Sequence, residues 1–392
     1  MDRIEFFTRQ QHPQEKPNRR IMTAADEHIG ILGAGQMGVA IAVAFLRWRF
    51  PVTLFDTSQE AVASAKSRVE AELALALPGS GTQNIAEIVR LLRCTDSPTE
   101  ACRATMVIET VTEKLRAKGK LYAQIAPLLD DSTLLTSNTS TISIDELAAT
   151  LPKESDLASR FCGFHFFHPV RERSLIEIIR GRATSQATLE RATQLATAID
   201  KTPLVVNNGP GFVVNRLLNA YLSGALQLLA EGATIRQIDD AAIRFGMAMG
   251  PFRIMDEIGL DVTLHGGWVL HKAFPDRVEP SPILLELIRE EHLGRKTGSG
   301  FYRYESPTMW DAIVTDNEIL NRQIAEKYRG RSTSPLPLVN DEMIIARTVG
   351  EMFREGRRIL DDGIVNSPAE IELAAVLGLG FPKDRWHNTT GH

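Results

Sequence analysis

Short apolar segments alternate with amphipathic stretches along the first half of the chain. The apolar segments begin at His28 and read HIGILG, VTLFD, MVIET, TLLTSN, FCGFHFF, SLIEIIRG and TPLVVNN. The stretches between the first of them carry apolar residues at helical spacing, including a long alanine-rich stretch after VTLFD. Strands that alternate with helices predict an α/β fold built on a doubly wound parallel sheet.

The pattern changes at Gly209-Pro210-Gly211, where the strand-like segments end. From Phe212 to about Ile288 the apolar spacing is purely helical, which predicts a separate all-α domain. We therefore expect a disordered N-terminal arm at 1–24, a sheet domain at 25–208, a helical domain at 209–305, a connector with a polar helix at 306–338, and a second helical block at 339–392.

The two helical blocks resemble each other. The segment LLAEGATIRQIDDAAIRFGMAMGPFR begins at Leu228, and ILDDGIVNSPAEIELAAVLGLGFPKDR begins at Ile359. With one gap, both contain an acidic residue and glycine, then an acidic and apolar helix, then glycine and proline at its end. This similarity predicts an internal duplication. The alternative is two unrelated amphipathic helices that happen to end in glycine.

Composition narrows the class of protein. The formal net charge of −5 argues against a general nucleic-acid binder, because phosphate binding depends on concentrated lysine and arginine. Cys94, Cys102 and Cys162 match no zinc or redox spacing, and we expect no metal. We find neither a secretory signal nor an uncharged apolar run of the roughly 18 residues that a membrane span needs. The expectation is therefore a cytoplasmic protein without a membrane partner.

A glycine-rich turn follows the first predicted strand. Gly33-Ala34-Gly35-Gln36-Met37-Gly38 lies between strand 29–32 and a helix that begins near Gln36. In such a turn the first glycine permits a tight bend, the second lets the backbone approach a pyrophosphate, and the third packs the helix on the strand. Asp56 ends the next strand, where a carboxylate binds ribose hydroxyls and disfavours a 2′-phosphate. The sequence predicts a Rossmann-type NAD site.

Two polar residues interrupt strands that are otherwise apolar. His165 lies within FCGFHFF and Glu177 within LIEII. A buried carboxylate needs a partner, and a neutral histidine beside it can donate one ring N–H and keep the other nitrogen free as a base. Oxidation of a secondary alcohol by a nicotinamide needs such a base for the hydroxyl proton. Taken singly, each residue is equally compatible with a structural role.

Six motifs in order, GAGQMG, ETVTEKLRAKGK, SNTSTISI, GFHFFHPV, LIEIIRG and GPGFVVNRLL, carry a resemblance. The chain resembles the L-3-hydroxyacyl-CoA dehydrogenase family, and its tandem helical tail is similar to the dehydrogenase part of multifunctional fatty-acid oxidation alpha subunits. The resemblance covers roughly Ile29 to Arg385. It implies a helical domain like the C-terminal domain of 6-phosphogluconate dehydrogenase.

The resemblance also implies roles for individual residues. It makes His165 the general base, oriented by Glu177, and makes Ser140 and Asn215 the groups that hydrogen-bond the reacting oxygen of the substrate. It places Glu113 and Lys118 near the cofactor, with Lys118 as a partner for the nicotinamide ribose or the thioester. The alternative for Glu113 and Lys118 is a solvated helix face.

The chain departs from the family pattern at two places. His168 stands where the family usually has an asparagine that touches substrate or cofactor, and imidazole cannot replace both hydrogen bonds of an amide. The segment ELALALPGSGTQN holds no basic residue where the family often supplies them to the phosphates of coenzyme A. Substrate choice or turnover is therefore expected to differ from the family, and the phosphates need another binding group.

The family resemblance predicts one activity for the chain, and two other functions stay open. The leading hypothesis is NAD-dependent oxidation of an L-3-hydroxyacyl-CoA in fatty-acid or 3-hydroxybutyryl-CoA metabolism, without the hydratase half of the multifunctional subunits. The alternatives are a dehydrogenase of a free hydroxy acid or sugar acid of the gulonate type, and a non-catalytic, crystallin-like NAD-binding protein. Single-repeat relatives form homodimers, so the second block predicts an internal pseudo-dimer in a monomer. A homodimer, and a thiolase or hydratase partner, stay open.

Overall fold

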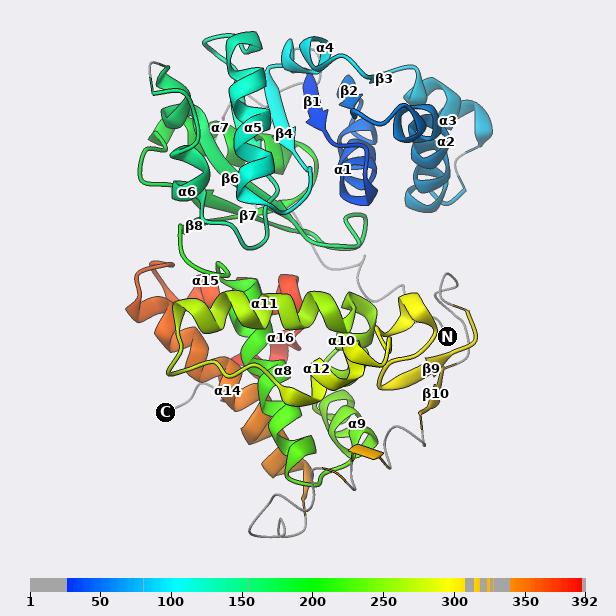
Figure 1. Cartoon of the computed structure of the whole chain (residues 1–392), viewed down its shortest axis with the longest axis vertical. Coiled ribbons are helices and arrows are strands. Elements are labelled where there is room, and N and C mark those ends of the chain that lie inside the picture. The colour runs from blue at the N-terminus through cyan, green and yellow to red at the C-terminus, as the bar shows by residue number, and fades with distance from the viewer. Residues whose placement is uncertain are drawn as a thin grey trace.

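The chain folds into two lobes, one built on a sheet and one helical (Figure 1). The computed structural model describes residues 27–79, 81–153, 155–306, 314–317, 323–324, 327 and 339–389. The expected arm at 1–24 lies outside the described residues, and of the polar helix of the expected connector only residues 323, 324 and 327 are described, all of them helical. In the part of the chain that the structure describes, no helix is long and apolar enough to cross a membrane.

Eight strands form the sheet, in the order β3-β2-β1-β4-β5-β6-β7-β8. They are β1 (Ile29–Leu32), β2 (Val52–Phe55), β3 (Leu92–Thr95), β4 (Met106–Glu109), β5 (Leu134–Ser137), β6 (Phe161–Phe166), β7 (Leu175–Arg180) and β8 (Thr202–Asn207). Strands β1, β2, β4 and β5 are buried along their whole length, because helices cover both faces of a parallel sheet. The expected doubly wound sheet is confirmed.

The sheet lobe also contains elements that the apolar pattern did not reveal. Its helices are α1 (Gln36–Leu46), α2 (Gln59–Ala76), α3 (Thr82–Val89), α4 (Pro98–Cys102), α5 (Leu115–Ile125), α6 (Ile144–Ala148) and α7 (Gln186–Ala198). The edge strand β3 and the short helices α3 and α4 were missed. Strand β3 reads LRCT, and three of its four residues are at least partly exposed, so it lacks the apolar run of the inner strands.

The expectation of a wholly parallel sheet is wrong at one pair of strands. Strand β7 runs antiparallel to β6, with His165 directly opposite Glu177, and β8 then runs parallel to β7. The connection 167–174 is too short for the crossover of a dozen or more residues that parallel neighbours require, so the chain must return antiparallel.

The second lobe is mainly helical, as expected. It contains α8 (Val214–Ala230), α9 (Ile235–Phe245), α10 (Pro251–Ile258), α11 (Leu260–Ala273), α12 (Pro282–Arg289), α14 (Asp341–Asp361), α15 (Pro368–Leu373), the π-helical turn Ala374–Gly378 and α16 (Lys383–Thr389). A small antiparallel pair, β9 (Tyr302–Tyr304) and β10 (Val314–Asp316), was not expected. Helix α11 lies along the side of this lobe that faces the sheet lobe (Figure 1).

The internal duplication stays a prediction, but the packing of α8 and α14 shows a matching symmetry. Arg216 on α8 pairs with Asp362 at 2.8 Å, and Arg347 on α14 pairs with Glu231 at 2.7 Å. The spacing from Arg216 to Arg347 equals the spacing from Glu231 to Asp362, so the two ion pairs are reciprocal. Each helix is followed by a glycine with positive φ, and then by a helix with a capping box.

The two long helices touch where α8 carries glycine. A Cβ atom added at Gly224 would lie 1.9 Å from the carbonyl oxygen of Arg347, so only glycine permits this approach. Helix α14 therefore packs on α8 through backbone contact where the two helices cross and through an ion pair on each side of that crossing.

Candidate active site

The glycine-rich turn has the geometry of a dinucleotide-binding loop. Gly33 has φ +114°, and a Cβ atom on Gly38 would lie 1.8 Å from the carbonyl oxygen of Gly33. Gly35 precedes the first residue of α1. Within the described part of the chain, no side chain caps this helix and no heavy atom lies within 4 Å of a Cβ added at Gly35. The N–H groups at the start of α1 therefore face open space, where a pyrophosphate can bind.

The residues around the loop fit NAD. At the end of β2, Asp56 Oδ2 accepts from the N–H of Ala34 at 2.8 Å and Oδ1 accepts from the N–H of Ser58 at 2.9 Å, which fixes the carboxylate beside the loop. Met37 packs against the core of the sheet lobe, and Gln36 is exposed at the start of α1. The loop, the helix start and the acid therefore suit a nucleotide with free ribose hydroxyls.

The structure brings His165 and Glu177 together. His165 Nδ1 lies 2.9 Å from Glu177 Oε2, and the two residues are 3% and 0% exposed. The imidazole also makes an edge contact with Phe167 at 4.5 Å between ring centroids. Because the carboxylate accepts the proton of Nδ1, the lone pair of Nε2 is left to accept a proton. Ser140 Oγ lies 3.0 Å from that nitrogen.

Glu177 also joins the two lobes. Its Oε1 accepts from the backbone N–H groups of Val213 and Val214, at 3.1 and 2.9 Å, where α8 begins. The carboxylate thereby satisfies N–H groups that the start of a helix leaves without partners. Asn215 follows directly, and its Nδ2 donates to the carbonyl oxygen of Ser140 at 3.1 Å. The four expected catalytic residues therefore form one connected cluster.

Glu113 and Lys118 do not form a solvated helix face. Lys118 is 1% exposed, and its Nζ lies 2.6 Å from Glu109 Oε1 and 3.2 Å from Glu113 Oε2. The buried ammonium group of Lys118 is thus paired with two carboxylates, of which Glu109 is buried and Glu113 is partly exposed. The contact from Lys118 to the nicotinamide ribose or the thioester stays a prediction.

Glu113 holds the loop that carries Ser140. Its Oε1 accepts from Thr139 Oγ1 and from the N–H groups of Ser140 and Thr141, at 2.5, 2.9 and 3.0 Å. Burial alone would raise the pKa of Glu113, but Lys118 and these hydrogen bonds outweigh it and hold the pKa below its usual value.

Two supporting residues were missed by sequence reasoning. Glu109 ends β4, is fully buried, and accepts from Lys118, Tyr122 and Ser137. Asn138 accepts from the N–H of Phe166 at 2.8 Å and so links β5 to the end of β6. The signal for Glu109 was present, because a carboxylate at the end of the apolar strand MVIE breaks the pattern as Glu177 does.

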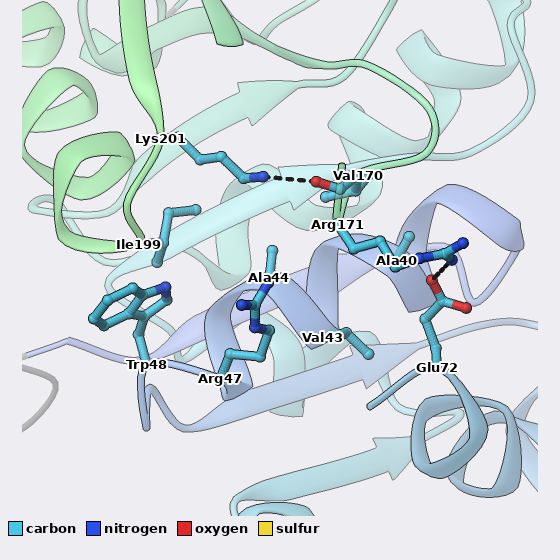
Figure 2. Close-up of a pocket in the computed structure, with 10 residues that line it drawn as sticks. All are labelled: Ala40, Val43, Ala44, Arg47, Trp48, Glu72, Val170, Arg171, Ile199 and Lys201. Carbon is cyan, nitrogen blue, oxygen red and sulfur yellow. Dashed lines mark hydrogen bonds and ion pairs between the residues drawn. The ribbon is translucent and has the colours of Figure 1, made fainter. Parts of the chain in front are cut away.

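His168 lies beside the cofactor loop. Its Nε2 is 3.0 Å from Gln36 Nε2, and both residues are exposed. The loop after His168 is braced by Lys201, whose Nζ donates to the carbonyl oxygens of Val170 and Arg173, both at 2.6 Å, and by an ion pair from Arg171 to Glu72 (Figure 2). The pocket in Figure 2 holds about 10 Å³, room for about one water molecule, so it cannot hold the cofactor.

Fold and site together define an NAD-binding oxidoreductase. The sequence model for the NAD-binding domain of 3-hydroxyacyl-CoA dehydrogenase matches residues 28–209, and the model for the C-terminal domain of the same enzymes matches residues 211–304. The chain belongs to the 3-hydroxyacyl-CoA dehydrogenase family.

Solved structures agree with this assignment. The chain is similar to 3-hydroxybutyryl-CoA dehydrogenase from Escherichia coli K12, with 26% identity and TM-score 0.77 over 93% of this chain and 92% of that one. It is 34% identical to (S)-3-hydroxybutyryl-CoA dehydrogenase from Ralstonia eutropha, with TM-score 0.67 over 71% of this chain and 99% of that one. The dehydrogenase part of multifunctional enzyme 1 from C. elegans is 28% identical, with TM-score 0.65 over 91% of this chain and 79% of that one.

We predict that Glu113→Ala loosens the Ser140 loop. The change leaves the N–H groups of Ser140 and Thr141 without their acceptor and leaves Lys118 with one carboxylate, which costs about 1–3 kcal/mol per buried group. Hydrogen exchange followed by mass spectrometry should show faster exchange at 139–142. Glu87→Ala, at an exposed position on α3, is the control and should leave exchange unchanged. Equal protection in both variants would contradict the role of Glu113.

Proposed function

We propose that the chain oxidises the 3-hydroxyl group of an L-3-hydroxyacyl-CoA to the 3-ketoacyl-CoA, with His165 as the general base. The observation that supports this most directly is the imidazole of His165, which is oriented by Glu177 through Nδ1 and has Ser140 Oγ at its other nitrogen. This arrangement suits removal of a proton from an alcohol.

In the proposed reaction, Ser140 and Asn215 bind the oxygen of the substrate. The hydroxyl of Ser140 and the amide of Asn215 can orient the alcohol and then the product carbonyl, and neither competes for the proton that His165 collects. Nε2 of His165 takes the hydroxyl proton, and Glu177 stabilises the imidazolium that forms. The glycine-rich turn and Asp56 would hold NAD, which would supply the acceptor for the hydride that leaves C3 of the substrate. His168 and Gln36 border the proposed site beside the cofactor loop.

The second candidate is a dehydrogenase of a free hydroxy acid or sugar acid. One observation favours it: the last turn of α2 and the whole of α3 hold no basic residue, so this end of the hairpin offers no cation to the phosphates of coenzyme A. The tandem helical tail, which is shared with the fatty-acid enzymes, favours the thioester.

A comparison of substrates tests both candidates. The purified protein with NAD should form NADH from L-3-hydroxybutyryl-CoA with kcat/KM at least about 100-fold above that for free L-3-hydroxybutyrate, because binding of coenzyme A contributes to the transition state. His165→Gln should lower kcat by about 100- to 10,000-fold while it leaves the Kd for NADH and the Tm nearly unchanged. Preferred turnover of the free acid would select the second candidate, and full activity of His165→Gln would reject the assigned base.

We further infer that one chain suffices for activity. The reciprocal ion pairs Arg216 to Asp362 and Arg347 to Glu231 support an internal pseudo-dimer, in which the second repeat covers the face of α8 that single-repeat relatives give to a partner. Light scattering of active protein should therefore give the mass of one chain, 43.4 kDa. A mass of two chains that does not fall on dilution would contradict this inference.

A further inference from the structure

A row of polar side chains extends along α8 away from the catalytic cluster. Asn215, Asn219 and Ser223 follow at intervals of four residues and so lie on one face of the helix. All three are half-buried, whereas most of the remaining α8 residues are apolar and buried. Adjacent turns bring Cβ atoms to roughly 5–6 Å, so Asn219 is the first polar group beyond Asn215.

Helix α11 passes this row where it carries two glycines. A Cβ atom on Gly267 would lie 3.6 Å from Asn219 Oδ1, and one on Gly211, just before α8, would lie 2.7 Å from Leu270. Helix α11 thus runs past the start of α8, on the side that faces the sheet lobe (Figure 1). Among the described residues, the amide of Asn219 has no hydrogen-bond partner.

Packing within the chain does not explain these glycines. Among the described residues outside the backbone of α11 itself, no heavy atom lies within 4 Å of an added Cβ at Gly266, and the single contact at Gly267 is at an ordinary van der Waals distance. Glycine is nonetheless among the least favourable residues inside a helix. Val262, one turn before Gly266, is 52% exposed and offers apolar surface on the same face. Gly266 and Val262 lie roughly 100–140° around α11 from Gly267, so the open apolar surface borders the side of the helix that meets the amide of Asn219. An acyl chain with a polar end requires apolar surface next to such an unpaired polar group.

We propose that Asn219 is a specificity-determining residue that hydrogen-bonds a polar group at the far end of the acyl chain. The preferred substrate is then a 3-hydroxyacyl-CoA whose acyl group ends in a hydroxyl or carboxylate about three carbons beyond C3, and not in a methyl group. This inference rests on the proposed function. A methyl end would leave the amide without a partner in a space that it closes to water, which disfavours that substrate.

Three six-carbon L-3-hydroxyacyl-CoA thioesters, with methyl, hydroxyl and carboxylate ends, test the proposal with the full chain and NAD. Wild type should show kcat/KM about 3- to 10-fold higher for the two polar ends than for the methyl end, the size of one net hydrogen bond. Asn219→Leu should abolish or reverse that preference. In Asn219→Asp, kcat/KM for the substrate with the hydroxyl end should stay within about threefold of wild type. The same variant should lower kcat/KM for the substrate with the carboxylate end more than about 10-fold, because the two like charges repel each other. Gln227→Leu, at an exposed position on the same helix, is the control and should change neither ratio.

The outcomes distinguish a failure of the role of Asn219 from a failure of the proposed function. Turnover of the thioesters with no preference in wild type, or with the same loss for all three in Asn219→Leu, would overturn the role of Asn219 and leave the proposed function intact. An equal loss would place Asn219 in contact with the part that the substrates share. Turnover of L-3-hydroxybutyryl-CoA but of none of the three would overturn this inference alone. Turnover of none of the four thioesters would reject the proposed function and this inference with it.

Discussion

The carboxylate of Glu177 sets the geometry on which the rest of the site depends. One oxygen holds the imidazole of His165, and the other accepts two backbone N–H groups at the start of α8. A single buried carboxylate thus fixes the direction of the base and the position of the helix that carries Asn215 and Asn219. A buried carboxylate without partners is strongly disfavoured. The imidazole of His165 and the N–H groups at the start of α8 therefore both stabilise Glu177 in the position where it contacts them. The lobes are joined at the same point where we propose that the chemistry takes place.

A second network of ion pairs and hydrogen bonds positions the loop that carries Ser140. Glu109, at the end of β4, holds Lys118, and Lys118 holds Glu113, which in turn binds the loop of Ser140. Asn215 reaches the same loop from α8. Ser140 is therefore held by both lobes, and its hydroxyl is directed at His165 Nε2. These contacts exist before any substrate binds, so the polar groups are already oriented for a reacting oxygen. Helix α14 packs on α8 at Gly224 and so supports the helix that carries Asn215.

Much of the fold and part of the site could be predicted from the sequence. The phosphate loop is local, so strand, glycines and helix are visible within one segment, and Asp56 follows at the end of the next strand. The pair His165 and Glu177 was suggested by polarity inside apolar strands, but its direct opposition depends on the antiparallel return of β7, which the short connection 167–174 could have revealed. The inward turn of Lys118 depends on Glu109, whose side chain no local pattern orients. The contact between His168 and Gln36 joins positions 132 residues apart, and only the folded chain brings them together.

The tautomer of His165 tests the central claim most directly. Nitrogen NMR of protein with ¹⁵N-labelled histidine and bound NAD can observe the ring nitrogens, and the resonances that disappear in His165→Gln assign this residue among the nine histidines of the chain. We predict a ring that carries its proton on Nδ1, where Glu177 accepts it, with Nε2 free to accept the proton of the substrate. A ring with its proton on Nε2 would show that Glu177 does not prepare His165 as a base, and would contradict the account.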